Sequence, residues 1–308
     1  MLAPMPTARP DGIVFFGTPA IAARCLSLMV ASGIRVHLVV TAEPKRRGRG
    51  SGFSKTPVHE LADQLGILVT HDLNQVVSHI DARSDRWLGV VVAYGHLIPK
   101  QVLVRLPLVN LHFSLLPRWR GAAPVERAIL AGDTEVGVCV MRIVEALDEG
   151  EVFARRAIPI GSADADELRD RLCVLGTNEL CRLLEEGFTN PVPQIGQSTY
   201  AKKISKDERR ISWCDSAEQV VRVTRIGGAH TEFGDQRIKI AKAHLADPGS
   251  GLPVWSCGEV RVASRQVVVA CGSGHVVLDS IQPAGRTVMS ALEWWNGLAS
   301  TLNPVRFT

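Results

Sequence analysis

The feature that most constrains the fold of this chain is a series of short apolar segments, each followed by residues that favour a helix. The first segment, residues 12–17, is rich in β-forming residues, and Thr18-Pro19 after it predicts an N-cap and a first helical position. Thr56-Pro57 predicts another helix start, and Gly66 predicts the end of that helix. Strands that alternate with helices are typical of a doubly wound parallel sheet, so we expect a Rossmann-like α/β domain.

Further segments continue this alternation to residue 186. Strands are predicted at residues 36–41, 67–70, 87–93, 108–113 and 136–143, and helices at residues 124–131 and 164–186. Because the chain has 308 residues, of which 46% are hydrophobic, it is long enough for about two globular domains.

A second domain is indicated beyond a polar, basic and proline-containing segment that begins after about residue 188. Such a segment is typical of an exposed connection, and we place the boundary between domains 1–205 and 206–308. Short strands punctuated by glycine are then predicted at residues 236–243, 258–263, 266–270 and 275–278, after a helix at residues 217–224. This pattern favours a small C-terminal β-barrel.

Charge and cysteine content limit the partners and the compartment. The formal net charge of +4 permits an anionic partner, and the seven scattered cysteines form no CxxC or other metal-ligand spacing. We therefore expect reduced thiols, no bound metal and a cytoplasmic location. The first residues lack an apolar signal core, and no apolar run approaches the roughly 18 to 20 residues that span a bilayer, so we expect neither secretion nor membrane insertion.

Asn110 and His112 are the leading candidates for chemistry. At positions i and i+2 of a predicted strand they point the same way, at the carboxyl end where open α/β sheets bind ligands. An imidazole can take a proton from an attacking amine, and an amide can hydrogen-bond an oxyanion, so the pair suits acyl transfer. The alternative is a buried histidine that is merely satisfied by a backbone partner.

Asp148 is a further candidate, because it lies in a polar, glycine-terminated turn after the predicted strand at 136–143. It could orient His112 and support the protonated imidazole. The alternative is an ordinary solvated turn. A nucleotide cofactor is not expected, because the GxGxxG pattern is absent after the first strand.

Residues 110–133, NLHFSLLPRWRGAAPVERAILAGD, resemble the signature of the folate-dependent formyltransferases, in particular those that act on methionine attached to initiator tRNA. Five other segments resemble the same family in the same order, from one end of the chain to the other. They are FFGTP (15–19), VVAYGHLIPK (91–100), LDEGEVF (147–153), YAKKISKDERRISW (200–213) and IQPAGRTVMSA (281–291).

The resemblance implies an enzyme that transfers the formyl group of 10-formyltetrahydrofolate to the amino group of methionine on initiator tRNA. It implies that His112 deprotonates the amine, Asn110 stabilises the oxyanion and Asp148 fixes His112. It also implies an OB-like barrel in the second domain and a folate site at two segments. The folate site would comprise Ser114, Leu115, Leu116 and Pro117, together with Tyr94, Gly95 and Leu97.

Two basic segments are candidates for tRNA binding. The segment at 43–56 is basic and rich in glycine, which suits phosphate binding, although an ordinary solvated loop is the alternative. The resemblance implies that this loop engages the tRNA acceptor end, with Arg49 as the strongest contact. The remaining candidates are Lys45, Arg46 and Arg47 in this loop, and Lys202 and Lys203 in the connection between the domains.

The chain departs from the family pattern at His230, where many relatives have Trp, and at Lys45-Arg-Arg, which is more basic than usual. Two other functions remain open. One is a formyltransferase for a small amine, such as an amino sugar, hydroxyornithine or a glycinamide nucleotide, which explains the basic loop and the second domain less well. The other is a noncatalytic RNA-binding module, which would not need the candidate catalytic side chains that this chain retains. We expect a monomer.

Overall fold

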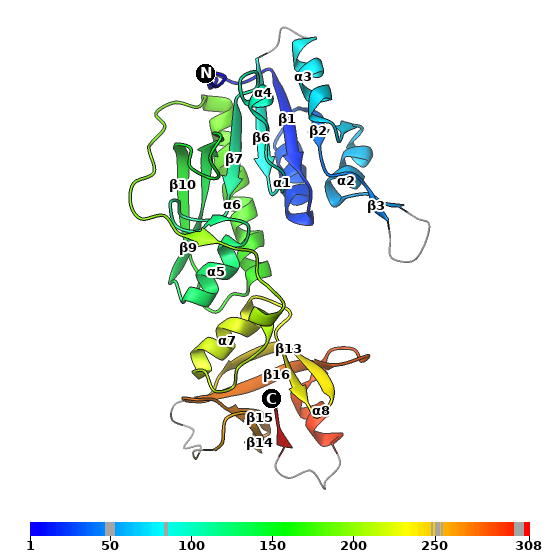
Figure 1. Cartoon of the computed structure of the whole chain (residues 1–308), viewed down its shortest axis with the longest axis vertical. Helices are drawn as coiled ribbons and strands as arrows, with labels where there is room; N and C mark the ends of the chain where they lie inside the picture. The colour runs from blue at the N-terminus through cyan, green and yellow to red at the C-terminus, as the bar shows by residue number, and fades with distance from the viewer. Residues whose placement is uncertain (47–52, 83–85, 248, 250–252, 254, 299–304) are drawn as a thin grey trace. The chain divides into compact units, whose positions relative to one another are not determined.

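The computed structural model describes residues 1–46, 53–82, 86–247, 249, 253, 255–298 and 305–308, and the chain divides into two compact units (Figure 1). The first unit contains residues 1–125, 134–159 and 168–202. The second contains residues 126–133, 160–167 and 203–308.

The first unit is built on a seven-stranded sheet with the order β10-β9-β7-β6-β1-β2-β5. The strands are β1 (Gly12–Gly17), β2 (Val36–Val40), β5 (Leu68–Thr70), β6 (Trp87–Val92), β7 (Leu108–His112), β9 (Glu135–Arg142) and β10 (Val152–Pro159). Strands β5, β2, β1, β6 and β7 run parallel, which confirms the α/β fold.

One edge of this sheet differs from the purely parallel arrangement that the sequence predicts. β9 runs antiparallel to both β7 and β10. The loop between β9 and β10 spans residues 143–151. This loop is too short for a parallel connection, which needs a crossover of about a dozen or more residues, so the sheet is mixed.

Helices cover both faces of the sheet. They are α1 (Ala20–Ala31), α2 (Pro57–Leu65), α3 (Leu73–Asp81), α4 (Lys100–Leu103) and α6 (Ala165–Glu186). On one face α1 and α6 lie together, because Cys25 Sγ is 3.0 Å from Cys173 Sγ. On the other face α3 and α4 share a buried cluster with side chains of β1 and β2.

The structure confirms the predicted ends of one helix and corrects the predicted start of another. Thr56 caps α2 by accepting a hydrogen bond of 3.1 Å from the His59 backbone N–H, and Gly66 ends this helix with a φ of 66°, as predicted. The predicted N-cap at Thr18 is wrong. α1 starts one residue later, after Pro19, because the Thr18 hydroxyl donates to the Tyr94 carbonyl at 3.3 Å instead of capping the helix.

The second unit contains the predicted barrel, as an antiparallel sheet with the order β12-β13-β16-β15-β14-β18. The strands are β12 (His230–Phe233), β13 (Gln236–Leu245), β14 (Glu259–Ala263), β15 (Gln266–Ala270), β16 (His275–Pro283) and β18 (Val305–Arg306), with β17 (Met289–Ser290) beside β16. Glu232 of β12 and Thr308 exchange two backbone hydrogen bonds of 3.0 Å, so the edges of the sheet nearly close.

The second unit also carries α7 (Ala217–Arg225), α8 (Ala291–Asn296), the 3₁₀ turn η1 (Asp207–Arg209) and most of α5 (Pro124–Ala131), a helix that the sequence predicts. Trp213, Trp294 and Phe307 stack inside the barrel, and the Trp213 indole N–H donates to the Thr231 hydroxyl at 2.9 Å. Among the helices that the structure describes in the whole chain, none is both long and apolar enough to cross a membrane.

Candidate active site

β7 presents Asn110 and His112 on the sheet face that α6 does not cover. Leu111, between them, packs against α6 at Gly176, where an added Cβ would be 2.8 Å from Leu111 Cδ1. Because strand side chains alternate, Asn110 and His112 point to the opposite face. His112 is buried, with 6% of its surface exposed, and Asn110 is half-buried.

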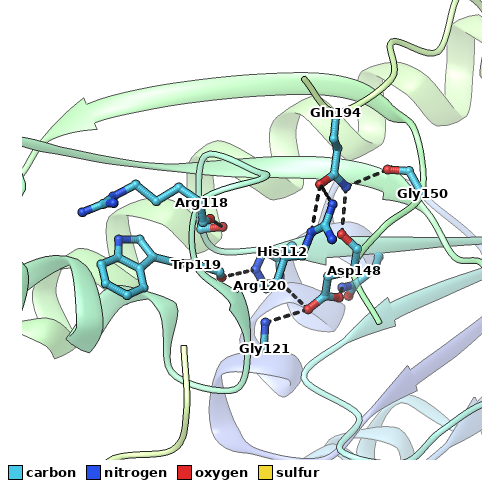
Figure 2. Close-up of polar contacts among 10 residues, drawn as sticks. His112, Arg118, Trp119, Arg120, Gly121, Asp148, Gly150 and Gln194 are labelled. Carbon is cyan, nitrogen blue, oxygen red and sulfur yellow. Dashed lines mark hydrogen bonds and ion pairs between the residues drawn. The ribbon is translucent and has the colours of Figure 1, made fainter. Parts of the chain in front are cut away.

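Asp148 meets both of these side chains from the loop between β9 and β10, and Figure 2 shows its carboxylate beside His112. Its Oδ1 accepts a hydrogen bond of 3.4 Å from Asn110 Nδ2, and its Oδ2 lies 3.7 Å from His112 Nδ1. Since β9 is antiparallel to β7, the loop starts at the amino end of β7, where the Ile143 N–H donates to the Leu108 carbonyl. The loop therefore folds back along the sheet to bring Asp148 to the pair.

A backbone contact defines the protonation of His112. Its Nε2 lies 2.9 Å from the carbonyl oxygen of Trp119. A carbonyl only accepts hydrogen bonds, so the network assigns the proton of the neutral ring to Nε2 and the lone pair to Nδ1. The nitrogen that can act as a base is therefore the one that faces Asp148.

The Asp148 carboxylate is held by the segment that follows Trp119. The Gly121 backbone N–H donates to Asp148 Oδ2 at 2.8 Å, and the carboxylate is only 10% exposed. Asp148 itself has a φ of 53°, a conformation that few residues other than glycine adopt readily. The position of the carboxylate thus depends on the neighbours that fix this turn.

Gln194 is one of these neighbours (Figure 2). Its Nε2 donates to the carbonyls of Asp148 and Gly150, both at 2.8 Å. Its Oε1 accepts from Arg120 Nη2 at 2.8 Å, and Arg120 Nη1 pairs with Glu149 at 2.7 Å. Arg120 is 9% exposed, whereas the Glu149 side chain is 45% exposed, so the network runs from a buried guanidinium to the surface.

The predicted folate residues fall into an exposed and a buried group. After β6, Gly95 has open space where a Cβ would stand, and Leu97 is 80% exposed. The Tyr94 side chain is buried edge-on against Phe16, and burial raises the pKa of Tyr94 above its usual value.

In the second folate segment, Leu116 is fully buried in a cluster with Cys139, Met141 and Val152, and the Ser114 hydroxyl donates to the Arg118 carbonyl at 2.7 Å. Leu115 and Pro117 are half-buried. The peptide bond before Pro117 is cis. Leu115 and Pro117 are therefore the members of this segment with side-chain surface that a ligand can contact.

The predicted tRNA-binding residues are separated in the sequence, and the structure describes some of them. Lys45 and Arg46 are exposed on β3 (Lys45–Arg46), which pairs with β4 (Phe53–Ser54), and Lys202 and Lys203 are exposed after β11 (Tyr200–Ala201). Arg47 and Arg49 lie outside the described residues. Within the part of the chain that the structure describes, no group of three or more His, Cys, Asp or Glu side chains could hold a metal ion.

Sequence reasoning missed Trp119, Gly121 and Gln194. Trp119 and Gly121 act through backbone atoms, which the residue type does not reveal. Gly121 offered a partial signal, because an isolated glycine often marks a close approach of two backbones, and a Cβ there would be 3.1 Å from the Ala201 carbonyl oxygen. A single glutamine in a loop gives no local signal.

An imidazole lone pair, an amide donor and a carboxylate on one sheet face can perform acyl transfer to an amine. The comparisons with known proteins specify the acyl group. Residues 12–184 match the family model described as formyl transferase, and residues 203–299 match the model described as formyl transferase, C-terminal domain. The fold and the site thus define a formyltransferase.

Similar curated proteins specify the family further. A methionyl-tRNA formyltransferase of Roseobacter denitrificans is 39% identical over 308 residues, covering 93% of this chain and 96% of that protein. One of Corynebacterium diphtheriae is 39% identical over 307 residues, covering 94% of this chain and 97% of that protein. The chain belongs to the methionyl-tRNA formyltransferase family.

Solved structures with lower identity share the fold. The sugar 3N-formyl transferase WlaRD superposes with a TM-score of 0.64 at 16% identity, over 91% of this chain and 99% of that one. HypX from Aquifex aeolicus, in complex with tetrahydrofolic acid, superposes with a TM-score of 0.59 at 16% identity, over 93% of this chain and 47% of HypX.

Proposed function

We propose that this protein, as a cytoplasmic monomer, transfers the formyl group of 10-formyltetrahydrofolate to the amino group of methionine on initiator tRNA. Domain 1–205 carries the chemistry, and domain 206–308 contributes to tRNA binding. The observation that supports this function most directly is the position of Asp148 beside both Asn110 and His112. The end-to-end similarity to relatives named for this activity supports the choice of acceptor.

His112 acts as the general base through Nδ1. As the amine nitrogen bonds to the formyl carbon, Nδ1 takes a proton from the nitrogen, because Nε2 is already committed to the Trp119 carbonyl. The imidazolium that forms faces Asp148 Oδ2 at 3.7 Å, and this negative charge stabilises it. The proton then passes to the folate nitrogen as its bond to the formyl carbon breaks.

Asn110 stabilises the negative charge that develops on the formyl oxygen. Its Nδ2 contact to Asp148 is long, at 3.4 Å, and hydrogen bonds of this length are weak. The amide can therefore turn a donor toward the substrate at small cost. A donor of this kind in a shielded site contributes about 3 to 4 kcal/mol to transition-state stability in other acyl-transfer enzymes.

The folate binds beside this cluster, at the loop after β6. β6 and β7 are parallel neighbours, so their carboxyl ends lie at the same edge of the sheet. The open space at Gly95 and the exposed Leu97 side chain suit a flat, partly apolar ring. Residues 114–117 complete the site, with Leu115 and Pro117 as its side-chain contacts.

The tRNA binds along the basic segments that contain Lys45, Arg46, Arg47 and Arg49, and along Lys202 and Lys203. An Arg49→Ala variant is expected to impair the use of tRNA while it leaves folate binding unchanged, and to reduce the salt dependence of tRNA binding. Kinetics measured at several salt concentrations test this role. Unchanged tRNA kinetics at every salt concentration would show that Arg49 does not contribute to tRNA binding.

The experiment that tests the function is an acceptor panel. Labelled formyl is supplied as 10-formyltetrahydrofolate, and the acceptors are charged initiator methionyl-tRNA, free methionine and small amines, including amino sugars. Transfer to the charged tRNA alone is the expected result. Transfer to a small amine alone would retain the chemistry of the cluster and refute the assignment of the acceptor.

A further inference from the structure

The segment from Gln194 to Ala201 forms hydrogen bonds with the two loops that fix the candidate catalytic side chains. Besides the bonds of Gln194, the Trp119 N–H donates to the Thr199 hydroxyl at 2.9 Å. β11 within this segment also pairs with β8 (Arg120–Gly121). One stretch of chain therefore holds both sides of the site.

Gln194 acts on the Asp148 side. Both of its amide donations go to carbonyls of the turn that carries Asp148, and one of these carbonyls is that of Asp148 itself. Arg120 fixes the orientation of the amide, because its Nε and Nη2 donate to Oε1 at 3.2 and 2.8 Å. Asp148 has a φ of 53°, which Asp adopts more readily than most non-glycine residues, and the two donations from Gln194 hold the turn in this conformation.

Thr199 acts on the His112 side through one residue. Its hydroxyl accepts from the N–H of Trp119, and the carbonyl of Trp119 accepts from His112 Nε2. Trp119 has a φ of 61°, which is again unusual for a residue with a side chain. The peptide that carries the Trp119 carbonyl is held separately, because the Arg120 N–H donates to the Thr199 backbone carbonyl at 2.9 Å. Loss of the Thr199 hydroxyl would free the N–H side of Trp119 and loosen the backbone whose carbonyl orients the imidazole.

We propose that Gln194 and Thr199 are positioning residues for formyl transfer, Gln194 for the Asp148 carboxylate and Thr199 for the His112 ring. This inference rests on the proposed function. Catalytic groups must be held close to their productive geometry, and a displacement of about 1 Å can lower the rate roughly a hundredfold. The two residues therefore affect the chemical step rather than substrate binding.

The test compares Gln194→Ala and Thr199→Val with Gln197→Ala, an exposed position in the same segment. The first two variants are expected to lower kcat roughly 10- to 100-fold with unchanged KM for folate and tRNA, whereas Gln197→Ala leaves both constants unchanged. Gln194→Glu keeps the acceptor for Arg120 but replaces the donating nitrogen with oxygen, so we expect the same loss of kcat. This variant serves as the test if Gln194→Ala does not fold.

Double variants separate positioning from a general structural role. If Gln194 acts through Asp148, adding Gln194→Ala to an Asp148→Asn variant lowers kcat little further. If Thr199 acts through His112, adding Thr199→Val to His112→Ala likewise lowers kcat little further. Independent, multiplicative losses would overturn the proposal. So would an unchanged kcat, or a change in KM alone.

Failure of the proposed function can be distinguished from failure of this inference. If the wild-type protein formylates a different amine, the same variants are measured with that amine. If it formylates no acceptor, nitrogen NMR of labelled histidine reports the His112 tautomer directly. The Nε2–H form in the wild type and its loss in Thr199→Val would support the Thr199 role, and an unchanged signal would overturn it.

Discussion

Replacing Asp148 with Asn tests the electrostatic role of its carboxylate. The change keeps the shape of the side chain and an oxygen that can accept from the Gly121 N–H, now 2.8 Å from Oδ2. It removes the negative charge 3.7 Å from His112 Nδ1, where the proton of the amine arrives. The variant should therefore bind both substrates normally and react slowly.

The expected loss follows from the distance. Two unit charges 3.7 Å apart, in a medium with an effective dielectric constant of about 20, attract by about 4.5 kcal/mol. If the proton is about half transferred in the transition state, half of this energy is lost, which corresponds to a roughly 50-fold slower step. Full transfer would give a roughly 2,000-fold loss.

Single-turnover transfer of labelled formyl to charged initiator methionyl-tRNA, at saturating folate, measures this step. Asp235→Asn, which removes a negative charge from an exposed position in the second unit, serves as the control. A rate for Asp148→Asn within about threefold of wild type would refute the electrostatic role that the geometry assigns to Asp148.

Two further predictions concern stability. Gly150→Ala should lower the free energy of unfolding by about 1 to 3 kcal/mol and also lower the activity, because the added Cβ would be 1.9 Å from the Arg142 carbonyl oxygen. Urea unfolding and a parallel activity assay measure these two effects. Burial and the nearby Arg237 lower the pKa of His230 below its ordinary value of 6.5, so the unfolded chain binds this proton more readily. Stability should therefore fall as the pH drops through 6.5, and His230→Gln should reduce that slope in urea unfolding at pH 7.5 and 5.5, whereas an unchanged slope would contradict the inference.

The sequence predicts elements that are determined by local signals. α2 begins and ends where Thr56 and Gly66 indicate, because a cap and a left-handed end depend on neighbouring residues alone. The elements it misses depend on distant partners. β10 has three consecutive exposed residues from Arg155, so it lacks the alternation of a half-buried strand, and β18 has only two residues.

The same distinction applies to the site. The spacing of Asn110 and His112 on one strand predicts that they share a face. By contrast, the antiparallel direction of β9 cannot be read from its residues, because it is set by pairing with β7. The contacts of the Trp119 N–H with Thr199 and of Gln194 with Asp148 join residues that are 80 and 46 positions apart in the sequence, so tertiary structure is needed to find them.

The central claim is that this cluster transfers a formyl group to methionyl-tRNA with His112 as the base. The most direct measurement is the time course of formylmethionine formation on charged initiator tRNA, for the wild type and for His112→Ala. We expect rapid transfer by the wild type and a rate at least about a hundredfold lower for the variant, with nearly unchanged tRNA binding. Equal rates for the two proteins, or no transfer by the wild type, would contradict the account.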